Sequence, residues 1–348
     1  MLNSAAPENA RGWLWPVVTL AGLAAIAAAL LTRPTAPDVT FSIFATRFLG
    51  IFIEAAPFLL LGTLVSGLLE VFVSREDIVR WIPRNAFAAP LLGAFLGFAF
   101  PVCECGVVPV TRRLFTKGLP MSAGVAFLLA APVMNPIVLV STYIAFGFGP
   151  VLIARYAVTA VVAISVGVVF ALAANPEQTL LPASFAAKAP GGLPVVNAGV
   201  PADNKRPGLG AGLVRALQFG TDEFFDMGRY LVIGCLLAAT MQMFAGQGDI
   251  QREMARLGSG PLISVITLQI IAFVLSVCST VDAFIALAFT GTFTTGSVVA
   301  FLTFGPMIDI KSTLMFAGVF RPRTVVYLVL LPFLMTLLTG VWINLLSR

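Results

Sequence analysis

Residues 86–111 read AFAAPLLGAFLGFAFPVCECGVVPVT. The apolar part, 86–102, carries no charge and leads into a motif of two cysteines, one carboxylate and a glycine. Pro101 and Pro109 flank this motif, and Gly106 loosens the chain between them. Such a stretch does not form a regular helix that faces lipid, because irregular backbone at membrane depth must be buried in protein or line a cavity. We therefore expect residues 86–111 to form a broken or re-entrant element of a membrane protein.

The composition of the whole chain also indicates a membrane protein. Of its 348 residues, 59% are hydrophobic and 11% are charged, whereas a soluble domain carries about 25% charged residues. The chain contains no histidine, which excludes imidazole metal sites and Ser-His-Asp or Cys-His catalysis. The net charge of +5 is expected to reflect basic loops that orient membrane helices, so the predicted partner is the lipid bilayer and not a nucleic acid.

About nine apolar segments, in a range of about 8–10, follow one another along the chain, and about 20 apolar residues suffice for one crossing. They lie near residues 13–31, 40–73, 86–111, 119–146, 150–174, 213–245, 261–290, 297–320 and 324–346. Between residues 175 and 210, frequent prolines and glycines and scattered charges interrupt this pattern, and they predict a flexible polar linker. The predicted organisation is an N-terminal extension with the first transmembrane helix (1–39), a first repeat (40–174), the linker (175–210) and a second repeat (211–348).

The two halves of the chain resemble each other at a nearly constant offset, as duplicated transporters do. Three pairs of motifs occur in the same order: IEAAPFLLLG (53–62) with FDMGRYLVIG (225–234), FPVCECG (100–106) with LSVCSTV (275–281), and AFLLAAP (126–132) with AFLTFGP (300–306). If the basic residues at 112–117 remain cytoplasmic, three crossings separate the start of the first repeat from the start of the second. An odd number of crossings places these two starts on opposite sides of the membrane. We therefore expect two inverted repeats with broken or re-entrant helices.

Ionisable side chains inside apolar segments are costly and are functional candidates by default. Glu54 lies in such a segment with no cation nearby in the sequence, and burial disfavours the charged form of a carboxylate. We assign proton coupling to Glu54, to its counterpart Asp226 and to Asp282. For Asp226, the alternative is a structural ion pair with Arg229, one helical turn away.

The thiols of Cys103 and Cys105 are soft donors suited to thiophilic species such as Cu(I) or trivalent arsenic. The alternative is that they only fill space in the core. Cys278 aligns with this motif and would supply a third thiol. The predicted substrate-binding residues are Cys103, Glu104, Cys105, Asn135, Cys278 and Asp309. Cys103 and Cys105 are metal ligands only if the substrate is a metal or a metalloid.

Interruptions at equivalent points of two halves are the best sequence indication of a transport site near the middle of the membrane. The stretches APVMNP (131–136) and GPMID (305–309) form such a pair, each with a polar residue three positions after a proline. A paired kink that only shapes packing is the alternative. The predicted helix breaks are Pro57, Gly106, Pro109, Pro132, Pro136 and Pro306.

Several motifs carry a resemblance to a known family: CECGVVP (103–109), Arg112-Arg113, Gly118, Pro120 and PVMNP (132–136). The chain resembles the predicted permease family (DUF318), which includes YraQ-like proteins and the ArsP-type organoarsenical efflux permeases, over residues 48–342. The resemblance implies a polytopic inner-membrane transporter, with thiol recognition of trivalent organoarsenicals in some members and divalent metal efflux in others. Family members often read C-S-C-G, whereas Glu104 adds a negative charge here.

These observations favour an all-α integral membrane protein that acts as a permease and exports a small thiophilic solute, with trivalent arsenicals as candidate cargo, coupled to protons. The alternatives are a divalent or monovalent metal ion or a small sulfur-containing anion as cargo, and, less favoured, a membrane dithiol redox protein. No GxxxxGK[ST] motif is present, so ATP hydrolysis is not expected, nor is any other enzyme activity or cofactor. The predicted location is a bacterial inner membrane, with the 175–210 linker in the cytoplasm and a homo-oligomer as one option.

Overall fold

A computed structural model of the protein describes residues 37–74, 85, 87–100, 102–173, 180, 209–245 and 260–346. Apart from an isolated bridge between Leu180 and Phe320, the regular structure in these ranges is helical, as expected for an all-α membrane protein. The helices are α2 (Pro37–Phe72), α4 (Ala88–Ala99), α5 (Glu104–Thr116), α6 (Met121–Met134), α7 (Pro136–Phe146), α8 (Pro150–Ala173), α11 (Leu209–Ala245), α13 (Ile263–Leu275), α14 (Asp282–Leu287), α15 (Thr295–Met307), α16 (Ile310–Val319) and α17 (Pro322–Leu346). The expected first span at 13–31 and most of the linker at 175–210 lie outside the described residues.

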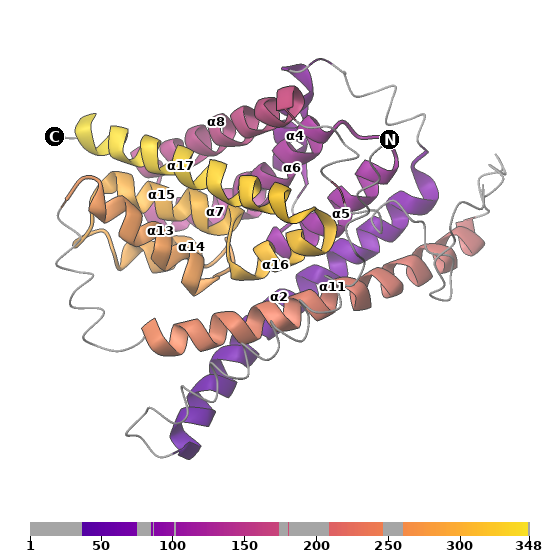
Figure 1. Ribbon diagram of the computed structural model, residues 1–348, viewed down its shortest axis with the longest axis horizontal. Helices are drawn as coiled ribbons and strands as arrows, with labels where there is room; N and C mark the ends of the chain where they lie inside the picture. The colour runs from indigo at the N-terminus through magenta and orange to yellow at the C-terminus, as the bar shows by residue number, and fades with distance from the viewer. Residues whose placement is uncertain are drawn as a thin grey trace, which may run out of the picture.

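Helices α2 and α11 are the two longest, and they pack against each other (Figure 1). They run in opposite directions, since Gly67 near the end of α2 lies against Ala216 near the start of α11. At the other end of the pair, Arg47 donates a hydrogen bond to the carbonyl of Gln242. A β-carbon at Gly67 would lie 2.2 Å from the carbonyl oxygen of Ala216, so glycine permits this direct contact between backbones.

The remaining helices form a bundle around α6 and α15 (Figure 1). Every residue from Met121 to Val133 of α6 is buried, because α6 packs against α4, α8 and α15. By contrast, α2 and α17 expose large apolar side chains, such as Ile53 (65% exposed) and Trp342 (64%). An apolar exterior with internally satisfied backbone is what lipid as a solvent requires.

Among the described residues, six helical stretches are long and apolar enough to cross a membrane. They are Phe41–Phe72, Met121–Phe146, Pro150–Leu172, Gly210–Met243, Thr295–Val319 and Pro322–Leu346. Two of these spans are broken, because α6 and α7 meet at Asn135, and α15 and α16 meet at Ile308 and Asp309. Helices α4 and α13, with 12 and 13 residues, are shorter than the roughly 20 residues that a crossing needs. The chain is therefore an all-α integral membrane protein, and its 86–111 region forms two short helices instead of one span.

Helix lengths recur in the two halves of the chain. Helices α2, α4, α5, α6, α7 and α8 contain 36, 12, 13, 14, 11 and 24 residues. Helices α11, α13, α14, α15, α16 and α17 contain 37, 13, 6, 13, 10 and 25 residues. Internal duplication would produce this order, and inversion would make α2 and α11 antiparallel. The inversion and the repeat boundaries at 40–174 and 211–348 stay predictions.

Three predicted helix breaks are wrong: Pro57 lies inside α2, and Gly106 and Pro109 lie inside α5. A proline removes only one backbone donor, and membrane helices tolerate this where neighbouring groups pack closely. At Pro109, the Ser66 hydroxyl donates to the proline carbonyl at 3.3 Å. The interruption lies earlier in the chain, after Ala99 and before α5 begins at Glu104.

Candidate functional site

The N-terminus of α5 brings two thiols and a carboxylate together. Cys103 is the N-cap residue of α5, and its carbonyl accepts hydrogen bonds from the backbone of Gly106 and Val107. Glu104 follows in the first turn, where the helix dipole favours a negative charge. The side chains of Cys103 and Cys105 lie within hydrogen-bonding reach of each other, and both are buried. The motif therefore forms one buried cluster of soft and acidic groups.

Lys311 brings a positive charge to this cluster from α16, in the other half of the chain. Its Nζ lies 3.5 Å from Oε1 of Glu104 and 3.5 Å from Oδ2 of Asp309, and all three side chains are almost fully buried. Burying such charges costs several kcal/mol per ion unless partners compensate them. The compensation is incomplete here, because Glu104 Oε2 and Asp309 Oδ2 accept no hydrogen bond. We call Glu104, Asp309 and Lys311 the central cluster.

Asn135 and Asp309, paired in the sequence comparison, occupy equivalent places in the structure. Asn135 Oδ1 accepts a hydrogen bond from the backbone of Val138 at 3.0 Å and caps α7. Asp309 Oδ1 accepts from the backbone of Ser312 at 2.6 Å, and the Ser312 hydroxyl accepts from the backbone of Asp309 at 2.9 Å. This capping box begins α16. Each broken span thus resumes at a polar N-cap residue.

The prolines at these breaks have different roles. Pro136 is the first residue of α7, where it costs no helical hydrogen bond and holds Asn135 in extended backbone. Pro132 and Pro306 lie inside the last turns of α6 and α15, so the helices end shortly after them. Asn135 also donates from Nδ2 to the carbonyl of Ala131 at 3.1 Å, which ties the two sides of the break together.

Replacing Asn135 with alanine is expected to lower the free energy of unfolding by about 1 kcal/mol, because Val138 loses its cap and Ala131 its donor. The apparent unfolding temperature in detergent measures this. Asn135→Ser is the matched control, since its hydroxyl keeps an acceptor for the helix N-terminus. Equal stability of Asn135→Ala and the wild type would contradict the capping role.

Cys278 lies between α13 and α14 and is buried. Its sulfur accepts a hydrogen bond from Thr280 at 3.6 Å and interacts electrostatically with Glu104 and Cys103. Within the ranges that the structure describes, no group of three Cys, Asp or Glu side chains is arranged to hold a metal ion. The aligned cysteine therefore lies near the central cluster without completing a preformed three-ligand site.

The end of α13 also contacts the break between α15 and α16. Ser276 adopts left-handed backbone with φ of 48°, which residues with a β-carbon rarely do. Its hydroxyl accepts a hydrogen bond at 3.3 Å from the backbone of Ile310, next to Asp309. The end of α13 is thus hydrogen-bonded to the start of α16.

Asp282, predicted to couple protons, lies in a buried bidentate ion pair. Arg155 Nη1 lies 3.1 Å from Oδ1 of Asp282 and Nη2 lies 2.7 Å from Oδ2, and Nη1 also donates to Thr142 at 2.9 Å. Because arginine remains charged in proteins, this geometry gives both oxygens of the buried Asp282 a cationic partner. The pair joins α8 of the first half to α14 of the second, which favours a structural role for Asp282.

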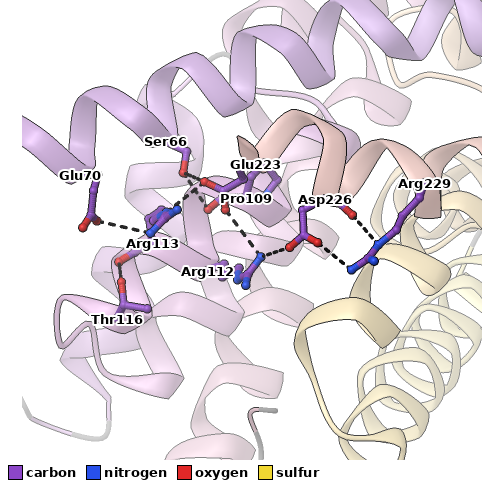
Figure 2. Close-up of polar contacts among 9 residues, drawn as sticks. All are labelled: Ser66, Glu70, Pro109, Arg112, Arg113, Thr116, Glu223, Asp226 and Arg229. Carbon is purple, nitrogen blue, oxygen red and sulfur yellow. Dashed lines mark hydrogen bonds and ion pairs between the residues drawn. The ribbon is translucent and has the colours of Figure 1, made fainter. Parts of the chain in front are cut away.

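A further ionic network joins α5 to α11 (Figure 2). Arg113 Nε lies 3.0 Å from Oε2 of Glu223, and Arg112 Nη1 lies 3.1 Å from Oδ2 of Asp226. Arg229 pairs with the other oxygen of Asp226 at 2.6 Å. Asp226 therefore lies between two guanidinium groups, an arrangement that favours the structural ion pair left open by the sequence.

Glu54 differs from Asp226, although the two occupy matching positions in α2 and α11. Glu54 is only partly buried, and it interacts electrostatically with Lys311 and Glu104. It lies at the edge of the central cluster, whereas Asp226 belongs to the network of Figure 2. The structure therefore brings Glu54 to the predicted substrate residues and leaves Asp226 and Asp282 in separate ion pairs.

Sequence reasoning did not single out Arg155 or Glu223, and it counted Lys311 among the ionisable candidates without giving it a role. Each lies in an apolar helix, and this is the signal that pointed to Glu54. Their partners lie 127, 110 and 207 positions away, respectively, so no local motif could show the pairing.

These features define a polytopic α-helical membrane protein of the transporter class, with broken spans around buried charges. The chain belongs to the family described as "Predicted permease" (ArsP_1), whose family model matches residues 40–345. The family resemblance carried by the CECGVVP and PVMNP motifs is thereby confirmed. Permeases are transport proteins, which agrees with the expectation that the chain is not an enzyme.

Two relatives cover most of the chain. It is 42% identical over 294 residues to the UPF0718 protein YcgR of Bacillus subtilis (strain 168), a match that covers 81% of this chain and 90% of the relative. It is 35% identical over 286 residues to a "putative two-component membrane permease complex subunit" of Streptococcus mutans serotype c, with 81% and 88% covered. The UPF0718 protein YraQ of Escherichia coli (strain K12) is 28% identical over 89 residues, or 26% of each chain. No solved structure matches the chain.

Proposed function

We propose that this permease exports a small thiophilic solute across a bacterial inner membrane, with trivalent arsenicals as the first candidate cargo. One observation carries the proposal: Cys103 and Cys105 are buried beside the Glu104–Lys311 pair, where the two halves of the chain meet. Asn135 and Asp309 would add polar contacts from the breaks, and Cys278 a third sulfur.

Soft sulfur donors support a thiophilic cargo, because carboxylates and carbonyls alone favour hard ions. Broken helices support transport at this place, since cargo sites of transporters lie where spans are interrupted near the middle of the membrane. A metal cation is the second candidate cargo. The buried oxygens Glu104 Oε2 and Asp309 Oδ2, which accept no hydrogen bond, favour a cation over an anion.

In this proposal, Glu54 exchanges the coupling proton. It is only partly buried on α2, and its interaction with Lys311 links its charge to the central cluster. Asp226 and Asp282 are less suited to this role, because arginine side chains already occupy the oxygens of both carboxylates.

The Cys103→Ser and Cys105→Ser variants are expected to lower accumulation of arsenite or phenylarsenite in inside-out vesicles about 10-fold or more, because a hydroxyl binds soft elements poorly. The vesicles come from a strain without its own arsenical and metal exporters. Antimonite, silver and zinc, run in parallel, identify the class of cargo.

Cys235→Ser tests the remaining thiol, since Cys235 is fully buried on α11 and interacts electrostatically with Lys311 and Asp309. In the same vesicles, Glu54→Gln should still bind cargo and should lose the response to an imposed pH gradient. A Cys103→Ser/Cys105→Ser double variant with full activity toward every thiophile would refute thiol recognition.

We also propose the topology and assembly of the permease. Three spans in each half would make the repeats inverted, with α4 and α5 re-entrant and the 175–210 linker in the cytoplasm. Antiparallel packing of α2 and α11 supports this arrangement. The name of the Streptococcus mutans relative suggests a second membrane component for this chain too, in addition to the homo-oligomer considered from the sequence.

A further inference from the structure

Lys311 occupies the position that a metal cation would take between two carboxylates. Its ammonium nitrogen is equidistant, at 3.5 Å, from an oxygen of Glu104 and an oxygen of Asp309. The two acids come from different halves of the chain, on α5 and just before α16. Lys311 therefore acts as a tethered cation at the centre of the molecule.

With both carboxylates ionised, the charges of the central cluster do not balance, since two buried carboxylates share one ammonium. Glu104 Oε2 is buried and accepts no hydrogen bond, so this carboxylate retains an oxygen for a further ligand, whereas Asp309 Oδ2 accepts no hydrogen bond and lies 3.5 Å from the Lys311 ammonium. The pair of Asp282 with Arg155 is one to one. Where α5 meets α2 and α11, the bases outnumber the acids. Arg112, Arg113, Arg229 and Lys117 face Glu70, Glu223 and Asp226, and all of these except Lys117 are drawn in Figure 2. Surplus buried negative charge thus lies in the central cluster.

The stem of Lys311 is fixed, whereas its end is not. A β-carbon at Gly234 would lie 2.8 Å from Cα of Lys311 and 3.3 Å from its Cβ, so α11 holds the base of the side chain. In the part of the chain that the structure describes, two ion pairs hold the nitrogen, both at the long distance of 3.5 Å. A cargo ion can therefore displace the ammonium group without moving the helix.

We propose that Lys311 determines the charge of the cargo: with Lys311 present, the site accepts a monovalent thiophilic cation, and without it a divalent one. The surplus of one negative charge matches one monovalent ion, and the adjacent sulfurs of Cys103 and Cys105 select a soft one. This inference rests on the proposed function in placing cargo at the central cluster. The partly exposed Glu54 lies outside the fully buried set and keeps its proposed role in proton exchange.

The test measures binding of Ag⁺, Cd²⁺ and neutral arsenite to the purified full-length protein in detergent, at one pH, by isothermal titration calorimetry. Lys311→Gln is expected to raise the affinity for Cd²⁺ relative to Ag⁺ about 10-fold or more, since an opposing charge is removed. Lys311→Arg keeps the charge and should leave the ratio unchanged. Arsenite carries no charge at neutral pH, so its affinity should be the same in all three proteins.

Glu104→Gln and Asp309→Asn provide a second test that retains Lys311. Each leaves one carboxylate for one ammonium, and Ag⁺ affinity should fall about 10-fold or more. Asparagine is also a good N-cap residue, as Asn135 shows at the equivalent break. Asp222→Asn, on the exposed side of α11, is the control that should not change binding.

The results separate this inference from the proposed function. If Lys311→Gln shifts the Cd²⁺ to Ag⁺ ratio no more than Lys311→Arg does, or if Glu104→Gln binds Ag⁺ as the wild type does, Lys311 does not set the charge of the cargo. Arsenite binding that depends on Cys103 would uphold the proposed function even then. If the wild type binds none of the three probes, both proposals fail.

Discussion

An Arg155→Ala variant is expected to lose about 3–5 kcal/mol of folding free energy, because Asp282 would remain buried without its counter-ion. Arg155 is fully buried, and its two Nη atoms lie 3.1 and 2.7 Å from the oxygens of Asp282. The pair is one of the contacts that join the two halves of the chain. In detergent, we expect the apparent unfolding temperature to fall by about 10 °C.

Two controls separate the buried ion pair from a general effect of removing arginine. Arg229→Ala removes a side chain that is 55% exposed and pairs with Asp226, so its cost should not exceed about 1 kcal/mol. The double variant Arg155→Met/Asp282→Leu replaces both charges with apolar groups and should recover most of the loss. If Arg155→Ala is as stable as Arg229→Ala, the ion pair contributes little to folding.

Local signals allowed the sequence to predict the class of fold and several breaks. A lipid environment requires few charges and long apolar runs whichever helices contact each other. These features therefore identified the membrane class without knowledge of any tertiary contact. Asn135 and Asp309 were found because a polar residue after a proline is a local sign of an interrupted helix. Glu104 was singled out because an ionisable side chain inside an apolar segment is costly and is therefore a functional candidate.

The partners of these residues could not be predicted, because pairing depends on how distant helices pack. Lys311 and Glu104 are 207 positions apart, and nothing in either local stretch indicates the other. Proton coupling was assigned to Glu54, Asp226 and Asp282, with a structural ion pair to Arg229 as the alternative for Asp226. Arginines from other helices pair with Asp226 and Asp282, and the sequence could not show this.

Prolines were misread for a related reason. The effect of Pro57 or Pro109 on a helix depends on what surrounds the unpaired carbonyl, and the sequence does not contain that information. Pro109 leaves the carbonyl of Cys105 without its usual helical donor, whereas the Ser66 hydroxyl of α2 donates to the carbonyl of Pro109 itself. Pro136 begins α7, and its place follows a local rule, since the first position of a helix needs no backbone donor.

A Gly62→Ala variant is expected to lose about 3 kcal/mol of folding free energy and most transport activity. A β-carbon at Gly62 would lie 2.4 Å from Cα and 2.7 Å from the carbonyl oxygen of Gly106, and both of these are backbone atoms that cannot rotate away. Helix α5 must therefore move away from α2, and the N-terminus that carries Cys103, Glu104 and Cys105 moves with it. Unfolding temperature and vesicle transport measure the two effects separately.

Gly50→Ala is the matched control on the same helix, since a β-carbon there has nothing within 4 Å. Alanine favours the helix at such a position, so this variant should gain up to about 1 kcal/mol and transport normally. Gly234, which aligns with Gly62, packs against Lys311 with a β-carbon distance of 2.8 Å. Gly234→Ala should therefore impair transport as well, because it displaces the other half of the central cluster. If Gly62→Ala or Gly234→Ala behaves like Gly50→Ala, close approach of the long helices is not what positions the cluster.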